Sequence, residues 1–225
     1  MTDTGEHATL EAEPTEGPVA GDAHPAEPTE EEIRRRDEAL ARVVTYGDPV
    51  LRSRASEIQE FGPELDAEAS QMITIMRDAM GVGLAATQLG ALRRLLVFQA
   101  GADATPTAVA NPVVEWSSDE LATAVEGCLS LPRVVMDVER PLYVRVSGAD
   151  ISGDPVLIEA SGLEARVLQH EIDHLDGVLI LDRTEREQRK GAMRALREGT
   201  SFAPPTEDDE DDEDESGSGE ASSGE

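Results

Sequence analysis

The chain has a single cysteine, and only 3% of its 225 residues are aromatic. One cysteine cannot form a disulfide within the chain, so the composition fits a reducing compartment. The sequence also has no apolar run of about 18 residues, the length that a transmembrane helix needs. Its first residues, MTDTGEHATLEAEPTEGP, are acidic and lack an apolar segment, unlike a secretory signal or a mitochondrial transit peptide. We therefore expect a cytoplasmic protein without a membrane segment.

Basic residues are absent from both ends of the chain. Residues 1–32 hold ten Asp or Glu and residues 203–225 hold eleven, with no Lys or Arg in either stretch. The 170 residues between them hold 27 acidic and 19 basic residues, so they carry little of the net charge of −29. We expect disordered acidic tails at 1–28 and 203–225 around one folded domain at 29–202. The negative surplus argues against DNA binding as the main task.

Apolar spacing and turn residues indicate four helices and five short strands between the tails. Three of the helices open on Ser or Thr followed three residues later by Glu, at Thr29, Ser161 and Thr184. Because short strands outnumber the helices, we predict a single-domain α+β fold with antiparallel or mixed sheets. The predicted helices span residues 30–42, 63–80, 162–175 and 184–198, and the predicted strands span 95–100, 108–116, 140–150, 155–161 and 177–182.

The helix predicted at 63–80 has apolar residues at spacings of three and four. Such a stripe packs in a core far more often than it binds a cofactor, so we assign it to the core. Its members are Leu65, Ala69, Met72, Ile73, Met76 and Met80.

The pattern QHEIDHLDG at 169–177 carries the strongest chemical signal. His170 and His174 are four residues apart on a predicted helix, so their imidazoles point the same way and can share one metal ion. Glu171 lies about 100° further round the helix, where it can reach a water beside the metal as a general base. Two unrelated surface histidines are the plain alternative, but the chain has only four His. We predict a metal-binding helix at the centre of the fold.

A third metal ligand has two candidate sources. A thermolysin-like protease site would need a downstream carboxylate such as Glu185 or Glu187, because no His follows His174. The other source is Cys128, in EGCLSLP (126–132), since thiolates bind zinc and ferrous iron. Two His and one Cys would leave a fourth tetrahedral position open, as in catalytic zinc sites.

The segment GVGLAATQLG (81–90) is a weaker signal. Gly81 and Gly83 permit close backbone approach, and Gln88 offers a side-chain amide. Alone, such a glycine pair indicates a turn after a helix, and its third glycine is wrongly spaced for dinucleotide binding.

Taken together and in this order, GVGLAATQ, EGCLS and HEIDH closely resemble the three motifs of the peptide deformylases. The resemblance covers about residues 43–185, and VVTYGDPVLR resembles that family's N-terminal segment. It implies a metal-dependent hydrolase that removes the N-formyl group from the N-terminal formyl-methionine of newly made proteins. It also implies one Fe²⁺ per chain, with Zn²⁺, Ni²⁺ or Co²⁺ as substitutes.

The resemblance assigns roles to particular residues. Glu171 would take a proton from water and return it to the departing amine. The backbone N–H of Leu129 and the side-chain amide of Gln88 would hold the oxyanion. The metal ligands would be Cys128, His170 and His174. The peptide would be bound by Val82, Gly83, Gly127, Leu163 and Val167.

The expected partners are N-formyl-methionyl nascent peptides. In some relatives a basic C-terminal helix touches the ribosome, and residues 183–198 here hold six basic and three acidic residues. We therefore expect a transient ribosome contact through this segment. A solvated helix face is the plain alternative.

Two features of the site stay open in the sequence. After EGCLSLP the chain has Arg133-Val134-Val135, where many relatives carry a triplet whose Arg can touch the substrate, so the peptide preference is undetermined. Arg140 could pair with Glu126 or with Asp173 and steady the site.

Two rival functions remain at this stage. The first is a metal-free thiol hydrolase that uses Cys128 with His170. The second is a catalytically silent binding module that acts through its acidic tails. The complete set of ligands and Glu171 favour the metal-dependent hydrolase.

Overall fold

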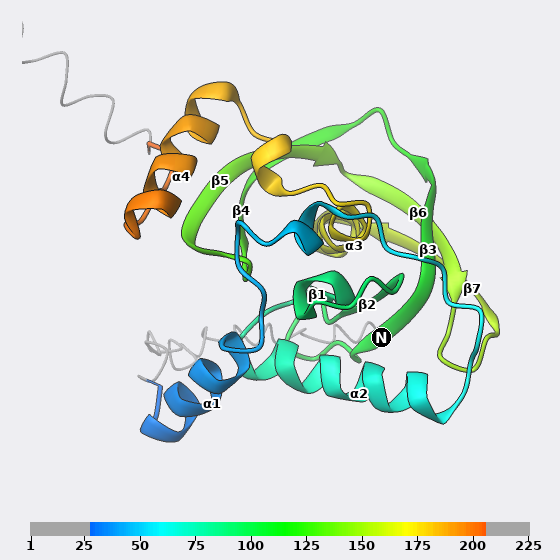
Figure 1. Cartoon of the computed structure of the whole chain (residues 1–225). Helices are drawn as coiled ribbons and strands as arrows, with labels where there is room; N and C mark the ends of the chain where they lie inside the picture. Colours follow the sequence, from blue (N-terminus) through cyan, green and yellow to red (C-terminus); the bar gives the residue numbers. More distant parts are fainter. Residues whose placement is uncertain (1–27, 206–225) are drawn as a thin grey trace, which may run out of the picture.

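The computed structural model describes residues 28–205 (Figure 1). The tails predicted at 1–28 and 203–225 therefore lie outside the described residues, except for residue 28 and residues 203–205. No helix in the described part of the chain is long and apolar enough to cross a membrane.

The described residues form four α-helices and seven strands. The helices are α1 (Glu30–Leu40), α2 (Pro63–Asp78), α3 (Gly162–Leu175) and α4 (Arg186–Glu198), with short 3₁₀ turns at η1 (Pro49–Arg52), η2 (Ala86–Leu89) and η3 (Ile180–Asp182). The strands are β1 (Gly83–Ala85), β2 (Leu95–Phe98), β3 (Thr107–Ser117), β4 (Leu121–Cys128), β5 (Leu131–Pro141), β6 (Tyr143–Ala149) and β7 (Pro155–Ser161).

The strands form two separate sheets. One has five strands in the order β1-β2-β3-β6-β7, and the other is the hairpin β4-β5. All the strand pairs are antiparallel. Helix α3 lies between the two sheets, seen end-on near the middle of Figure 1. This arrangement confirms the predicted α+β fold around a central helix.

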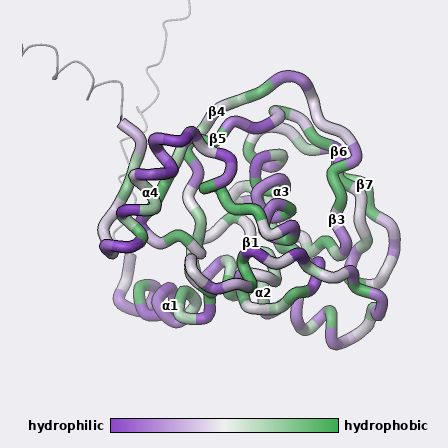
Figure 2. The backbone as a smooth tube through the Cα atoms, turned by 45° about the horizontal axis from the view of Figure 1, so that its top comes forward, coloured by the Kyte–Doolittle hydropathy of each residue, from purple (hydrophilic) through white to green (hydrophobic). Residues whose placement is uncertain are grey.

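Helix α3 is central because it is buried on nearly all sides. Eight of its fourteen residues are buried, from Ala165 to Leu175. Leu168 and Leu175 are fully buried, and each contributes roughly 1.5–3 kcal/mol relative to an exposed position. The periphery is more polar: Figure 2 shows the hydrophilic colour along much of α1 and α4. A buried helix can hold polar side chains only if they are paired, which makes its His and Glu residues informative.

The hairpin β4-β5 was not predicted from the sequence, although it carries Cys128. The strand predicted at 177–182 is wrong, because this segment is a loop that leads into the 3₁₀ turn η3. Its apolar residues are buried against the hairpin and α4. A short apolar run fits a buried turn as well as a strand, so periodicity could not separate the two.

Smaller corrections concern helix ends. Thr29 and Glu32 form the predicted capping box. Ser161 precedes α3 without a capping bond from its side chain, and the N-terminal cap of α4 is Glu185 rather than Thr184. Met80 lies beyond α2 and is 71% exposed, so its assignment to the core was wrong.

Candidate metal centre

Three side chains with metal-ligating atoms converge where β4 ends against α3. The ligand atoms of Cys128, His170 and His174 all lie within 4.8 Å of one another, and Cys128 Sγ is 3.2 Å from His174 Nε2. A tetrahedral ion with bonds of about 2.0–2.3 Å holds its ligands about 3.3–3.7 Å apart. One thiolate and two imidazoles at this spacing therefore fit zinc or ferrous iron without large movement.

The register of the hairpin brings Cys128 to this point. Gly127 pairs with Val135, whereas the next residue, Cys128, pairs with Leu131. Residues 132–134 consequently loop out of β5, and the irregularity ends β4 at the cysteine. Bulges of this kind bend a strand and redirect its side chains. This explains why a sequence pattern with period two did not reveal the hairpin.

A buried charge network fixes the orientation of His170. Its Nδ1 lies 2.9 Å from Glu126 Oε2. Arg140 donates from Nε to Glu126 at 2.6 Å and from Nη1 to Asp173 at 2.8 Å, so it pairs with both of its candidate partners. With Nδ1–H donating to Glu126, the lone pair of Nε2 is directed at the ligand cluster, as in other metal-binding histidines.

The same network sets the charge states around the ligands. Burial would raise the pKa of Glu126, but hydrogen bonds from His170 and Arg140 outweigh it and lower that pKa to about 2. Burial, which disfavours the charged form, lowers the pKa of His174. His174 is therefore held as the neutral imidazole, the form that binds a metal.

Glu171 lies beside the ligand cluster and is 96% buried. Its Oε2 has no hydrogen-bond partner among residues 28–205. Burial raises the pKa of this carboxyl to about 7, so it can both accept and donate a proton near neutral pH. A cation at the three ligands would pull the pKa down again by stabilising the carboxylate.

Gln88 is held with its amide nitrogen toward the cluster. Its Oε1 accepts from the backbone N–H of Ala85 at 2.8 Å, which fixes the orientation of the amide. Its Nε2 then faces Ser130 Oγ at 3.4 Å and Cys128 Sγ at 3.8 Å. These are long contacts for a donor, so the N–H groups are available to a stronger acceptor. The sequence offered no independent sign of this fixed orientation.

A cleft of about 400 Å³ opens beside the cluster. Ten of the eleven predicted site residues line it; the exception is His174, which is buried behind it. The cleft also has walls that are not among the predicted site residues, among them Met80, Val125, Arg133 and Arg166. The metal ligands, Glu171 and Gln88 thus belong to one site, at a largely apolar cleft.

Comparison with known proteins decides the family. A family model described as polypeptide deformylase matches residues 40–190. The chain belongs to the peptide deformylase family. Peptide deformylase 1 of Corynebacterium glutamicum is 45% identical over 166 residues, which make up 73% of this chain and 98% of that protein. The peptide deformylase of Brucella suis biovar 1 is 42% identical over 158 residues, covering 69% of this chain and 90% of that protein.

Solved deformylase structures share the fold. The structure of a peptide deformylase from Synechococcus elongatus in complex with actinonin is 39% identical, with a TM-score of 0.66; the match covers 73% of this chain and 91% of that one. The structure from Thermotoga maritima is 42% identical, with a TM-score of 0.62 and coverage of 64% and 97%. The resemblance of the three motifs to the deformylases is confirmed, and with it the activity: a metal-dependent hydrolase that removes the N-formyl group from nascent peptides.

Proposed function

We propose that this deformylase reaction takes place in the cleft beside Cys128, His170 and His174. The observation that carries the proposal is the convergence of these three ligands with a buried carboxylate, Glu171, in one cleft. We also propose Fe²⁺ as the native ion, one per chain, with Zn²⁺, Ni²⁺ or Co²⁺ as substitutes that suit the same donors. When bound, the ion supplies Lewis acidity, which polarises the formyl carbonyl and lowers the pKa of water.

Glu171 is the proposed general base and acid. Its carboxylate takes a proton from the water that attacks the formyl carbon, and a new C–O bond forms. The same carboxyl group then gives its proton to the nitrogen of methionine as the C–N bond breaks, which releases formate and the peptide amine. Glu171 thus makes both proton transfers, from water and to the methionine nitrogen. A carboxyl pKa near the working pH suits a group that must accept a proton and then donate it.

Gln88 and Leu129 are the proposed donors to the oxyanion. The amide nitrogen of Gln88 faces the cluster without a short hydrogen bond, and Leu129 lies next to Cys128 in the wall of the cleft. Donors that are already in place stabilise developing charge without reorganisation, and losing one typically lowers the rate about 10²–10³-fold.

The peptide is proposed to lie extended between β1 and the end of β4. Val82 and Gly83 on one side and Gly127 on the other offer main-chain groups, as in binding by strand addition. Leu163 and Val167, one turn apart on α3, would form with Val82 an apolar pocket for the methionine side chain. Leu163 and Val82 are 55% and 46% exposed, so this apolar surface is open to a ligand.

The proposal is tested by assaying the anaerobically purified protein on formyl-Met-Ala-Ser and measuring its metal content. Wild type should deformylate the peptide with one metal ion per chain. Glu171→Ala should keep its metal, because no ligand is changed, and lose turnover. A chelator should abolish activity. If metal-free protein turns over the peptide and alkylation of the thiol stops this turnover, the thiol hydrolase is favoured. If the protein is inactive when loaded with iron, nickel or cobalt, the silent module is favoured.

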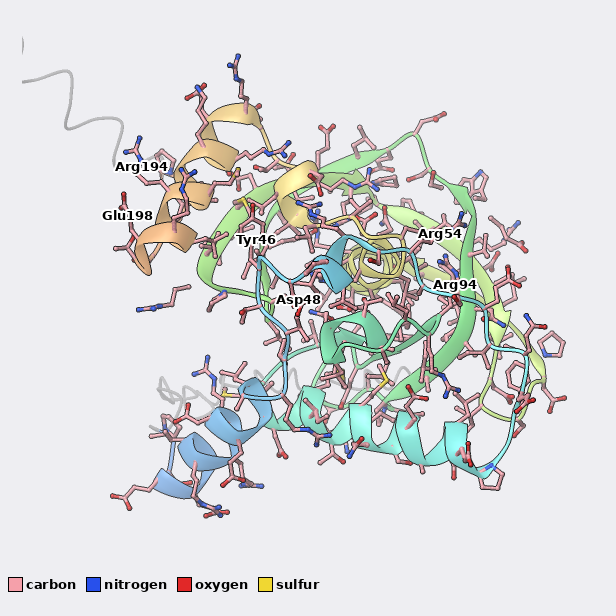
Figure 3. The ribbon with its side chains drawn as sticks, in the orientation of Figure 1. Tyr46, Asp48, Arg54, Arg94, Arg194 and Glu198 are labelled. Carbon is pink, nitrogen blue, oxygen red and sulfur yellow. The ribbon has the colours of Figure 1, made fainter. Side chains whose placement is uncertain are left out.

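A second proposal concerns the ribosome. Helix α4 packs on β5 through Ala192 and Ala195, and five basic residues of the helix are exposed: Arg186, Arg189, Lys190, Arg194 and Arg197. Figure 3 shows α4 at the edge of the domain, with Arg194 and Glu198 directed away from it. An exposed basic face suits the phosphates of ribosomal RNA. The acidic residues after 203 would compete with RNA, so deleting 203–225 should tighten ribosome binding at low salt; an unchanged affinity would contradict the idea.

A further inference from the structure

Arg133 has an unusual backbone conformation in the wall of the cleft. Its φ is 62°, in the left-handed region that residues with a Cβ rarely adopt. It is the middle residue of the loop 132–134 that the register of the hairpin pushes out of β5. A residue stays in such a conformation only where its surroundings determine it, and such residues cluster at functional sites.

The chain after α4 holds Arg133 in place. Phe202 donates from its backbone N–H to the carbonyl of Arg133 at 3.0 Å, and its own carbonyl accepts from the N–H of Val135 at 2.9 Å. The ring of Phe202 packs over Gly191 of α4, where a Cβ would collide with it. The two hydrogen bonds bracket Val134, so residues 133–135 are tied to the C-terminal segment as well as to β4.

Arg133 also differs from the other charged residues of the cleft. Glu126 and Glu171 are buried, with 6% and 4% exposure. Arg166 is bound to Glu126 at 2.7 Å. Arg133 is exposed and has no ion-pair partner among residues 28–205. Within the described part of the chain, it is therefore the one exposed charged side chain of this cleft that has no ion-pair partner.

We propose that Arg133 determines peptide specificity by attracting an acidic side chain shortly after the formyl-methionine. The inference rests on the proposed function, because it takes the peptide to lie beside Gly127. Val135 pairs with Gly127 and is two residues from Arg133. The carboxylate would thus come from the second to fourth residue of the peptide. The rest of the cleft lining is largely apolar and also accepts peptides without an acidic residue. Arg133 therefore sets a preference among peptides and is not required for the reaction.

The size of the preference follows from the exposure of the pair. Exposed ion pairs contribute about 0.2–1 kcal/mol, which corresponds to at most about five-fold in kcat/KM. The Debye length falls from about 10 Å at 0.1 M salt to about 3 Å at 1 M. A Coulombic preference must therefore shrink with added salt, whereas a preference from shape would persist.

The test compares formyl-Met tetrapeptides that carry Asp or Asn at the second, third or fourth position. For wild type at low salt, we expect kcat/KM to be about two- to five-fold higher for Asp at one or more positions, with the ratio falling toward one at 1 M salt. Arg133→Lys should keep the ratio above one and Arg133→Gln should remove it. Arg36→Gln is the matched control, because Arg36 is an exposed arginine on α1 that does not line the cleft, and it should keep the wild-type ratio.

Two results would overturn the assignment. The first is an Asp-to-Asn ratio of kcat/KM equal to one at all three peptide positions, measured with active wild type. This result does not depend on whether any variant folds. The second is a preference that survives Arg133→Gln or high salt. Either result leaves the proposed function intact, since turnover of the neutral peptides shows deformylation. Absence of turnover with every formyl peptide would overturn the proposed function and this inference together.

Discussion

Adding one methyl group at Gly83 should damage the site without touching a metal ligand. A Cβ at this position would lie 2.8 Å from Glu171 Cδ and Cγ, and closer still to Oε1. To reach an ordinary contact of 3.4 Å, the carboxyl must move by at least 0.6 Å. Misplacement of a catalytic group by about 1 Å can cost about 10²-fold in rate. We therefore expect Gly83→Ala to lower kcat by about ten- to a hundredfold.

The expected effect of Gly83→Ala on stability is smaller. Overpacking lowers the free energy of unfolding by about 1–3 kcal/mol. Replacing Gly by Ala also reduces the conformational freedom of the unfolded chain, which raises the free energy of unfolding by about 0.4–1 kcal/mol. The assay is kcat on formyl-Met-Ala-Ser, together with metal content and urea unfolding. Gly62→Ala is the control, because a Cβ there meets nothing within 4 Å. If Gly83→Ala keeps kcat within two-fold of wild type with its metal bound, then Glu171 is not the base.

Two further predictions concern charged residues. Glu126→Gln removes the charged partner of His170. Metal affinity, measured by competition with a chelator, should therefore fall about 10–100-fold. Glu139 is exposed, so Glu139→Gln is the control and should leave the metal affinity unchanged. Burial would raise the pKa of Asp182, but its hydrogen bond with Arg52 outweighs burial and lowers it. Because the carboxyl of Asp182 has a lower pKa in the folded protein than in the unfolded chain, its ionised form stabilises the native state at pH values above the unfolded pKa, near 3.8. This stabilisation is lost as the pH falls through the pKa of the folded state. Asp182→Asn should therefore lower Tm at pH 7, with the gap to wild type closing toward pH 3; a gap that stays constant from pH 7 to pH 3 would contradict the assignment.

The helical half of the site was predictable from sequence. The i, i+4 spacing of His170 and His174 sets their common direction wherever a helix forms. The family motifs then favoured Cys128 over the downstream carboxylates as third ligand, and added Gln88 and Leu129, whose roles no local spacing could supply.

The rest of the site depends on long-range register. The hairpin β4-β5 places Cys128 through an irregularity that disrupts the alternation of side chains. The pairing of Arg140 with both Glu126 and Asp173 joins three elements that are far apart in the chain. The conformation of Arg133 depends on Phe202, about seventy residues later. Contacts of this kind have no signature in a short stretch of sequence.

The accessibility of the one thiol, with and without metal, tests the central claim most directly. Because Cys128 is the only cysteine, alkylation detected by mass spectrometry reports on a single site. Protein loaded anaerobically with one metal ion per chain should resist alkylation and deformylate formyl-Met-Ala-Ser, because a coordinated thiolate is a poor nucleophile. Removing the ion with a chelator should expose the thiol to one alkylation and abolish turnover. Equal alkylation in both states, with turnover that survives removal of the ion, would contradict a metal centre formed by Cys128, His170 and His174.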